Sequence, residues 1–247
     1  MEKRNQYHMD KVPSVGIWDK LKSNRFLSKY AHLIDPPDPV FVTKLGRSRI
    51  HKLLESLDKN KKSLNIGSGS TRYSKDIINL DLFPDKNGDV VGNSALLPFK
   101  DESFSIIICQ AVLEHVEDPD QSVREIKRVL KRGGMIYVEL PFFQGLHATP
   151  AYSDFRRYTI AGIQNMFREF ELLEKGVLAG PGSALAWTLR EFLAILLSFN
   201  SVYLYRIFNL FFGWLTVPVK YLDYFLEKSR FSFTIASGFF FLGKKYN

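Results

Sequence analysis

Six short apolar runs, separated by amphipathic or turn-rich segments, constrain the fold of this chain more than any other feature of its sequence. They fall within residues 63–180 and read SLNIG, DIINLDLF, GDVVG, FSIIICQ, GGMIYVEL and FELLEKGVL. Several are four to six residues long and almost continuously apolar, which is typical of strands buried on both faces. The segment from Pro119 to Lys131 predicts a helix, since Asp118 can cap its start and Gly133 suits its end. Strands alternating with helices predict a parallel sheet covered by helices.

The flanks of this region differ from it in composition. Residues 1–62 carry 14 Lys and Arg against 7 Asp and Glu and contain several prolines, and Lys44–Asn60 predicts a helix because its apolar residues recur at helical spacing. The 247 residues suit one domain with a sizeable insertion. We therefore divide the chain into a basic extension, a core, a hydrophobic helical insertion and a final core strand, at residues 1–62, 63–182, 183–229 and 230–247.

The insertion is strongly aromatic, because 17 of the chain's 35 aromatic residues lie between Trp187 and Phe241. A polar stripe runs along it at alternating spacings of 3 and 4: Arg206, Asn209, Gly213, Thr216, Lys220, Asp223 and Glu227. On a helix this stripe is narrow and leaves the other faces apolar, and Pro218 must kink or divide the helix. Polar residues and Pro218 interrupt the longest apolar stretch, which disfavours a transmembrane span. A helical cover packed on the core or on a partner subunit, an interfacial membrane helix and a spanning hairpin are the alternatives for the insertion.

The net charge of +8 is unevenly distributed, at +7 over residues 1–62, −3 over 63–145 and +4 over 146–247. This pattern favours an anionic partner or a membrane surface, with an ordinary solvated surface as the alternative. Nucleic-acid binding is not expected, because no RNA-binding signature, zinc finger or long basic run is present. A single cysteine, Cys109, excludes a disulfide framework and a cysteine-built zinc site, and we expect no metal. The polar start predicts no signal peptide and a cytoplasmic location.

A glycine-rich turn follows the first apolar run, in LNIGSGST at Leu64–Thr71. Gly67 and Gly69 would let backbone N–H groups approach a ligand closely. A nicotinamide dinucleotide site is disfavoured, because Arg72 stands where the third glycine of that motif would be. Asp81, which ends the next run only 14 residues after Gly67, is placed to accept hydrogen bonds from a ribose diol, and the helix between them must be very short. A simple tight turn and a loop aspartate are the alternatives.

Residues 60–180 strongly resemble class I S-adenosylmethionine-dependent methyltransferases of the small-molecule type, the "methyltransferase domain 11" kind. LNIGSGS resembles their first motif, INLDLF their acidic second strand, and LKRGG their Lys-Pro-Gly-Gly turn, all in the family's order. The resemblance implies a Rossmann-like α/β fold with a seven-stranded sheet, helices on both faces, and S-adenosylmethionine as cofactor. Its last strands, about 171–178 and 232–243, form an antiparallel pair after a helix at 159–168, so the hydrophobic insertion must lie between them.

The resemblance also implies a set of cofactor-binding residues. It places Asn65, Gly67, Ser68 and Gly69 at the methionine portion, and Asp81 at the ribose. Around the adenine it places Leu82, Asn93, Ser94 and Ala95, and at the sulfonium Gln110 and Ala111. The chain departs from the family's pattern at Asn65, where Asp or Glu is usual, and at Asn93, where an aspartate often meets the adenine; an amide oxygen can still accept that bond.

Methyl transfer to oxygen also needs a general base. His115 follows the fourth strand, and His147 and Asp154 lie in the loop QGLHATPAYSDFRRYT after the fifth. A packing histidine and a plain loop are the alternative interpretations of these residues. The DFRRYT segment resembles one found in methyltransferases of glycan and surface-polysaccharide gene neighbourhoods. Arg156 and Arg157 could hold a phosphate or carboxylate, or pair with surface carboxylates.

We therefore expect a methyltransferase acting on a hydroxyl or carboxyl of a sugar, a lipid-linked glycan or another amphiphilic small molecule. The alternatives are a quinone or lipid head-group methyltransferase and a catalytically silent cofactor-binding scaffold at the membrane. The surplus of apolar side chains, with Lys220, Lys228, Arg230, Lys244 and Lys245 around it, predicts peripheral contact with the inner face of a membrane or a homodimer through residues 190–228.

Overall fold

A seven-stranded sheet with the order β3-β2-β1-β4-β5-β7-β6 forms the centre of the computed structural model, which describes residues 35–55, 62–83, 87–147 and 152–246. All its strand pairs are parallel except those of β7, which runs antiparallel to both β5 and β6. The strands are β1 (Ser63–Ile66), β2 (Ile77–Asp81), β3 (Val90–Val91), β4 (Phe104–Gln110), β5 (Leu130–Pro141), β6 (Phe170–Ala179) and β7 (Gly238–Lys245). Each predicted apolar run is therefore a strand, and the predicted fold class is confirmed.

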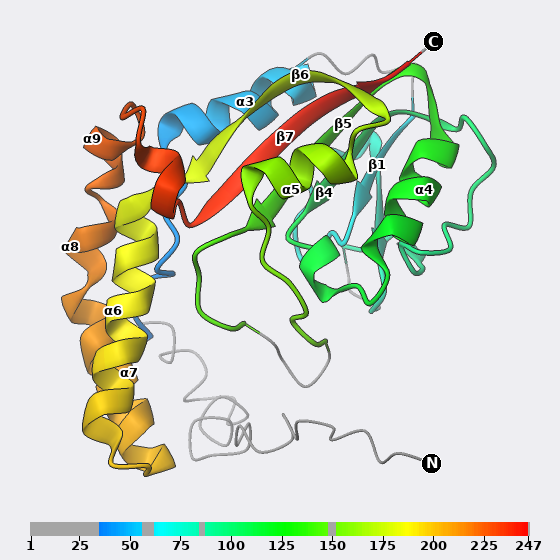
Figure 1. Cartoon of the computed structure of the whole chain (residues 1–247). Helices are drawn as coiled ribbons and strands as arrows, with labels where there is room; N and C mark the ends of the chain where they lie inside the picture. Colours follow the sequence, from blue (N-terminus) through cyan, green and yellow to red (C-terminus); the bar gives the residue numbers. More distant parts are fainter. Residues whose placement is uncertain (1–34, 56–61, 84–86, 148–151, 247) are drawn as a thin grey trace, which may run out of the picture.

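The sheet is buried on both faces because successive side chains of its central strands point to opposite sides. In β4, Ile107 and Cys109 pack in the cluster that includes residues of α4 (Pro119–Val129) and α5 (Ile160–Met166). Ile106 and Ile108 pack in a second cluster with Ile50 and Leu53 of α3 (Lys44–Glu55). Figure 1 shows α5 and α4 in front of the sheet and α3 behind it.

The predicted helices are present with small differences in length. Asp118 caps α4 by accepting a hydrogen bond from the Gln121 N–H at 3.0 Å, as predicted, but α4 ends at Val129. It ends there, two residues early, because Leu130 is extended and already begins β5. The predicted helix at 159–168 is the shorter α5, which Thr159 caps. The predicted helix Lys44–Asn60 is α3 up to Glu55, and residues 56–61 lie outside the described part of the chain.

The expectation of a very short helix between Gly67 and Asp81 is wrong. Residues 67–76 form turns and extended backbone that lead directly into β2. Asn79 holds this segment in place, because its side-chain amide donates to the Thr71 carbonyl at 2.9 Å and to the Asn87 carbonyl at 3.0 Å. Hydrogen bonds from a buried asparagine replace the helix that would otherwise order the connection.

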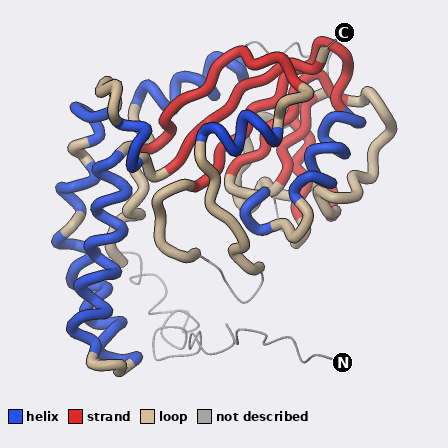
Figure 2. The backbone as a smooth tube through the Cα atoms, viewed as in Figure 1, coloured by secondary structure: helices blue, strands red, loops and turns tan. Residues whose placement is uncertain are grey.

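The chain leaves the sheet after β6 and returns in β7, with four helices between them. These are α6 (Pro181–Ser198), α7 (Val202–Leu215), α8 (Val217–Lys220) and α9 (Asp223–Leu226). Figures 1 and 2 show α6 and α7 side by side as a hairpin that projects away from the sheet; we call these four helices the helical arm. Pro218 divides the predicted long helix, since α7 stops at Leu215 and α8 starts at Val217. The last strand is shorter than predicted because Ser232–Ile235 is a 3-10 turn.

The polar stripe of the helical arm faces inward, toward α6 and the core. Asp223 is fully buried and Thr216 is 4% exposed, while Asn209 donates to Glu191 of α6 at 3.0 Å. Lys220 is 5% exposed and donates to the Asp38 carbonyl at 2.6 Å.

The outer face of the helical arm is apolar instead, and we call it the apolar arm surface. Its side chains are 48–81% exposed: Phe192, Ile195, Leu196, Phe199, Tyr203, Ile207, Phe211, Trp214 and Leu215. The arm is thus polar inside and apolar outside, the reverse of a helix pair that is solvated by water.

The predicted basic residues around this surface are mostly elsewhere. Lys220 is buried, and Lys245 donates to the Leu130 carbonyl at 2.6 Å, at the end of β7 far from the arm (Figure 1). Lys244 shares that end of β7, so only Lys228 and Arg230 lie near α9. The expected basic ring is therefore wrong, because β7 carries its two lysines away from the helices.

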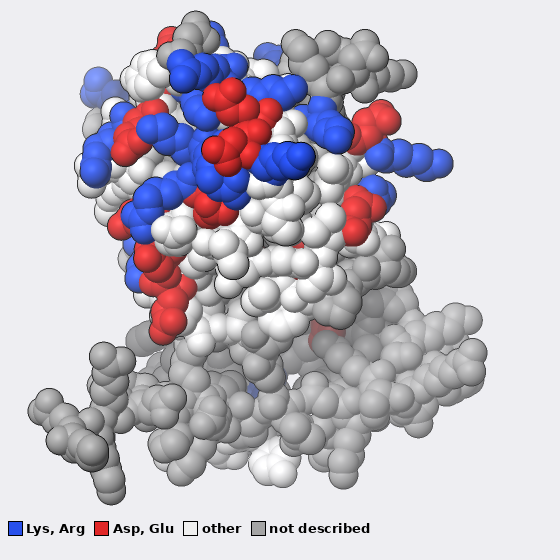
Figure 3. Space-filling view, turned by 90° about the vertical axis from the view of Figure 1, so that its right-hand side faces the viewer, with Lys and Arg blue, Asp and Glu red and all other residues white. Residues whose placement is uncertain are grey.

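Charges on one face of the described core are mixed in sign. Figure 3 faces the side of the molecule that carries α4, and basic and acidic side chains interleave on it. Several are paired there: Lys127 with Glu169, Arg128 with Asp101, and Arg132 with Glu102. This face has the character of a solvated surface, and most of the basic residues of 1–62 lie outside the described residues. No single described helix is long and apolar enough to cross a membrane; α7 and the segment Val217–Leu226, bent by 48°, pass that test only as a pair.

Candidate active site

A cavity of about 480 Å³ opens at the carboxyl ends of β1, β2 and β4. This is the edge at which open parallel sheets bind ligands. Of the predicted cofactor residues, Gly67, Gly69, Asp81, Leu82, Asn93, Ser94 and Ala111 line it, together with the predicted catalytic residue His115. The cavity is also lined by residues that sequence reasoning missed, among them Ile66, Phe83, Val112, Glu117 and Tyr152.

The glycine-rich turn after β1 needs both of its glycines. Gly67 has φ +64° and Gly69 has φ +47°, in the left-handed region that favours glycine. A Cβ atom at Gly67 would lie 2.2 Å from Cγ2 of Val112, whereas one at Gly69 would meet nothing within 4 Å. Gly67 therefore permits close packing of two chain segments, and Gly69 faces the open space that a ligand would enter.

Asp81 ends β2 and closes the turn from the opposite side. Its Oδ2 accepts a hydrogen bond from the Gly69 N–H at 2.8 Å, and its Oδ1 accepts one from the Phe83 N–H at 3.0 Å. Each carboxylate oxygen has further lone pairs, so both can still accept hydrogen bonds from a diol. The structure thus brings together the turn and the acidic residue that the sequence identified separately.

Two of the predicted cofactor residues make contacts that shape the cavity on the adenine side. The side-chain oxygen of Asn93 accepts a hydrogen bond from the Ala95 N–H at 2.9 Å, and the hydroxyls of Ser94 and Ser122 are 2.9 Å apart. The first bond stabilises the turn after β3, and the second ties that segment to α4. Ala95 contributes its backbone to this turn and does not line the cavity.

Asn65, Ser68 and Gln110 also lie outside the cavity lining. Asn65 is 2% exposed and its amide donates to Asn79 at 3.3 Å, so it joins β1 to β2 inside the sheet. Gln110 accepts a hydrogen bond from the hydroxyl of Tyr73, whose burial raises its pKa to about 12. Ser68 is 4% exposed. The departure from the family at Asn65 is therefore matched by an amide partner, Asn79, in the neighbouring strand.

The loop that contains DFRRYT is bound to the segment after β4. Arg156 donates to the carbonyls of Val116 at 2.6 Å and Glu117 at 2.8 Å, and the Tyr158 hydroxyl donates to the Leu113 carbonyl at 2.9 Å. Arg156 is therefore committed to backbone carbonyls and not to an anionic ligand. These bonds explain why an arginine and a tyrosine are needed two residues apart: they fix the loop beside the cavity.

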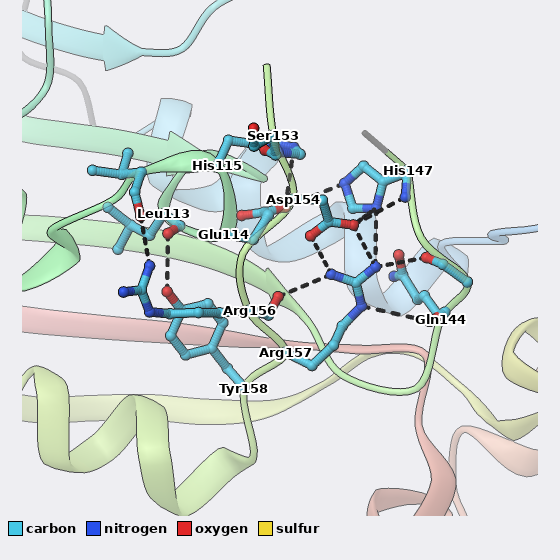
Figure 4. A network of polar contacts seen from close by, with 12 residues as sticks. Leu113, Glu114, His115, Gln144, His147, Ser153, Asp154, Arg156, Arg157 and Tyr158 are labelled. Atoms are coloured by element: carbon cyan, nitrogen blue, oxygen red, sulfur yellow. Dashed lines mark hydrogen bonds and ion pairs between the residues drawn. The ribbon is translucent and has the colours of Figure 1, made fainter. Parts of the chain in front are cut away.

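His147, Asp154 and Arg157 form one network in this loop (Figure 4). Arg157 donates to both carboxylate oxygens of Asp154, at 2.5 and 2.6 Å, and the backbone N–H of His147 donates to Oδ2 at 2.9 Å. Desolvation alone would raise the pKa of Asp154, but these hydrogen bonds outweigh it and lower that pKa below its ordinary value. A carboxylate held in this state suits the orientation of His147 better than the removal of a proton.

Glu114 lies against both histidines and was missed by sequence reasoning. Its side chain is fully buried, and neither of its carboxylate oxygens has a hydrogen-bond partner in the described part of the chain. Oε1 lies 3.9 Å from Nε2 of His115 and 3.7 Å from Nε2 of His147. The signal that could have found it is a charged residue that directly follows the apolar residues Ala111–Leu113 and precedes a histidine.

Comparison with known proteins decides the family. Residues 57–138 match a family model described as "Methyltransferase domain". The chain contains a class I methyltransferase domain. The predicted family is confirmed, and with it S-adenosylmethionine as the cofactor of the domain.

The relatives of this methyltransferase domain are similar over only part of the chain. An uncharacterized protein of Methanocaldococcus jannaschii, MJ1123, is 35% identical over 103 residues, which are 37% of this chain and 50% of that protein. The ubiquinone/menaquinone biosynthesis C-methyltransferase UbiE of Vibrio vulnificus is 36% identical over 81 residues, 33% of this chain and 28% of UbiE. The matches thus span half or less of these curated relatives.

A solved structure shares the fold over most of the chain. The phosphoethanolamine N-methyltransferase 2 of Haemonchus contortus, in complex with S-adenosyl-L-methionine, aligns with a TM-score of 0.52 and 14% identity. The alignment covers 95% of this chain and 61% of that one. At this identity the likeness describes the fold and not the acceptor.

Proposed function

We propose that this protein transfers the methyl group of S-adenosylmethionine to a hydroxyl or carboxyl oxygen of an amphiphilic acceptor, such as a lipid-linked sugar. The observation that carries this proposal is that the cofactor cavity, the histidine cluster and the helical arm meet. His115 lines the cavity, and its ring lies 4.8 Å from that of His147 between centroids. The ring centroid of Trp187, in α6, lies 6.1 Å from that of His147.

The cavity fits the cofactor by its own features. Open space in front of Gly69 leaves room for a ligand beside backbone N–H groups, and the Asp81 carboxylate closes the far side. When bound, S-adenosylmethionine supplies the methyl group: the acceptor oxygen forms the new bond to carbon, and sulfur keeps the electron pair of the broken bond as S-adenosylhomocysteine. The acceptor proton leaves on the side of His115 and His147. Holding the oxygen in line with the methyl group contributes on the order of 7–11 kcal/mol in well-oriented reactions.

The apolar arm surface supports a lipid-linked acceptor and a peripheral position on a membrane. Its exposed side chains lie on the outward faces of α6 and α7, whereas the polar residues of the arm are buried against α6 and the core. Water does not favour this arrangement, but the boundary between lipid head groups and acyl chains does. Because Lys220, Lys244 and Lys245 do not surround this surface as predicted, we expect apolar burial, more than attraction to anionic lipid, to drive binding.

A vesicle-sedimentation experiment tests the membrane contact. The full chain should sediment with phosphatidylcholine vesicles, and 20% phosphatidylglycerol should strengthen binding only slightly. Replacing Phe192, Ile207 and Phe211 by serine should each weaken binding by about tenfold or more, since each replacement loses apolar area worth about 1.5 kcal/mol or more when buried. The matched control replaces exposed apolar residues of the core by serine at Leu96, Leu172 and Leu173.

The outcome of this experiment distinguishes membrane binding from a homodimer that forms through residues 190–228. A wild-type protein that does not bind vesicles and is dimeric, and that becomes monomeric after the serine substitutions, would favour the dimer. A protein that ignores vesicles and is monomeric throughout would contradict both.

Incubation with labelled S-adenosylmethionine and a membrane extract tests the activity itself. Label in a glycolipid is the expected result. Label in a quinone or a lipid head group would favour the alternative acceptors, for which the similarity to UbiE is the supporting observation. Tight cofactor binding without any labelled product would favour a catalytically silent scaffold at the membrane.

A further inference from the structure

Glu114 is the most unusual buried group in the described part of the molecule. It is an ionisable side chain with no exposed surface, and both of its carboxylate oxygens lack a hydrogen-bond partner among the described residues. An unpartnered buried carboxylate costs several kcal/mol, so a fold keeps one only where something compensates for it. Its Oε1 faces the Nε2 atoms of His115 at 3.9 Å and of His147 at 3.7 Å.

Each of these histidines turns its Nε2 toward the carboxylate and its Nδ1 toward the loop that contains Ser153 and Asp154. Nδ1 of His115 lies 2.7 Å from the Ser153 carbonyl, which can only accept, so the proton is on Nδ1. Nδ1 of His147 lies 3.3 Å from Oδ2 of Asp154 and 3.4 Å from Nη2 of Arg157, so these two groups hold the ring with its Nε2 toward the buried carboxylate. Two imidazole nitrogens and a carboxylate oxygen thus face one another, and each can serve as a metal ligand.

From this arrangement we propose that Glu114, His115 and His147 bind a divalent transition-metal ion. One ligand atom from each lies within 4.8 Å of the other two. Zinc bound at about 2.0–2.2 Å places its ligands about 3.3–3.5 Å apart, so small side-chain rotations close the site. Two histidines and one carboxylate suit zinc, iron(II), manganese or cobalt and disfavour magnesium, which prefers oxygen ligands.

The surroundings of the three residues also fit a metal site. Ligating histidines usually donate a hydrogen bond from their second ring nitrogen to a carbonyl or a carboxylate. His115 makes this bond to the Ser153 carbonyl, and Nδ1 of His147 lies beside the Asp154 carboxylate. Arg157 in turn holds Asp154 with two hydrogen bonds (Figure 4). Asp154 and Arg157 of the DFRRYT segment thus hold His147 in position. This is a structural role for the segment in place of the anion binding that its arginines suggested.

Three protein ligands leave a coordination position open for a substrate oxygen. One of the three, His115, also lines the cofactor cavity. An acceptor hydroxyl bound at the open position loses its proton to solvent more easily, since the ion lowers its pKa. Its oxygen then forms the bond to the methyl carbon while sulfur takes the electron pair of the old bond. The products are the methyl ether, S-adenosylhomocysteine and one proton. This role rests on the proposed function, whereas the binding of the ion does not.

Metal binding is tested directly on the full chain after treatment with EDTA and dialysis. Titration calorimetry with zinc chloride should give one equivalent bound with a Kd below about 1 µM, and magnesium chloride should give no heat. Cobalt(II) at the same site should produce visible d–d absorption bands that zinc abolishes. Glu114→Gln and His147→Gln should each weaken zinc binding by more than about 100-fold, since loss of a supporting residue alone costs about 10–100-fold.

The matched control is His51→Ala, which removes an exposed histidine of α3 and should leave zinc binding unchanged. Without metal, Glu114→Gln should melt no lower than the wild type, because it removes an unpartnered buried charge. Zinc should then raise the Tm of the wild type but not of this variant. If Glu114→Gln does not fold, His147→Gln on the partly exposed loop carries the test.

Two results would overturn the site: a wild-type protein that binds no zinc at 100 µM, or equal zinc affinity in the wild type and both variants. S-adenosylmethionine titrated into the same metal-free protein keeps the questions apart. Cofactor binding without zinc binding would refute the metal site and leave the proposed function standing. Zinc binding without cofactor binding would support the metal site and refute the proposed function.

Discussion

Ser183 donates two hydrogen bonds to one carboxylate oxygen of Asp223, from its backbone N–H at 2.9 Å and from its hydroxyl at 2.7 Å. Gly180 and Gly182 donate their N–H groups to the same carboxylate, at 3.1 and 2.7 Å. Asp223, in α9, therefore caps the first turn of α6, which no side chain of its own N-cap residue caps. A negative charge at a helix N-terminus also interacts favourably with the helix dipole.

Asp223→Ala should lower the free energy of unfolding by about 3 kcal/mol, because it leaves several buried donors without an acceptor. Urea unfolding monitored by circular dichroism measures this. Asp118→Ala, which removes the exposed cap of α4 with its single hydrogen bond, is the control and should cost about 1 kcal/mol. Equal losses in the two variants would contradict a special role for Asp223.

Asp81→Ala should weaken S-adenosylmethionine binding by about 1.5–3 kcal/mol, or roughly 10- to 150-fold, the scale of a hydrogen bond to a charged group. Calorimetry measures the affinity. Asp76→Ala is the control, since Asp76 is exposed just before β2 and its hydrogen bonds within the described part of the chain are with Ser74. Wild-type affinity in Asp81→Ala would remove Asp81 from the cofactor site.

The two glycines of the turn should respond differently to alanine. Both substitutions strain a left-handed backbone by about 1–2 kcal/mol, but Gly67→Ala also forces a Cβ against Val112. We therefore expect Gly67→Ala to lose more unfolding free energy in urea. Gly69→Ala should instead lose cofactor affinity more than stability. Adding Val112→Ala should recover part of the loss at Gly67 and none at Gly69.

Glu125 links acid stability to one buried ion pair. Arg128 donates hydrogen bonds to the two carboxylate oxygens of Glu125, at 2.7 and 2.8 Å. These bonds, with a smaller contribution from the hydrogen bond of the Leu97 N–H, lower the pKa of Glu125 although desolvation raises it. A depressed pKa in the folded state contributes stability above the ordinary value of about 4.3, and this contribution is lost as the pH falls through the folded-state pKa. Glu125→Gln should thus cost about 1.5–3 kcal/mol at pH 7 and progressively less below pH 4.

Unfolding at a series of pH values measures this difference. The control is Glu169→Gln, which removes the exposed partner of Lys127 and should change stability by less than about 1 kcal/mol at any pH. A pH-independent cost of Glu125→Gln would show that packing, and not the charge, is responsible.

His147→Ala should reduce methyl transfer by about 10²–10⁴-fold while leaving S-adenosylmethionine affinity intact, since His147 lies beside the cofactor cavity and not in its lining. His115→Ala should reduce turnover similarly but also affect cofactor binding, because His115 lines the cavity. Undiminished turnover in both variants would remove the histidine cluster from the reaction.

The sequence by itself determined the sheet and the cofactor side of the site. Buried parallel strands need unbroken apolar runs, and a turn at positive φ needs glycine, so Leu64–Thr71 and Asp81 could be identified without coordinates. Such requirements are local, because a few consecutive residues carry them. The sequence did not reveal that Gly67 and Asp81 are connected without a helix, because the side chain of Asn79 holds the connection instead.

Only the tertiary structure decided which distant residues meet. Glu114 and His147 are 33 positions apart, and their contact depends on hydrogen bonds that hold the DFRRYT loop against the segment after β4. Likewise, the stripe from Arg206 to Glu227 is visible in the sequence, but its direction is not. Asp223 turns inward because the N-terminus of α6 offers it buried donors, and this leaves the apolar side chains of α7 outside. Periodicity identifies the faces of a helix; only the partners of each face decide which one is buried.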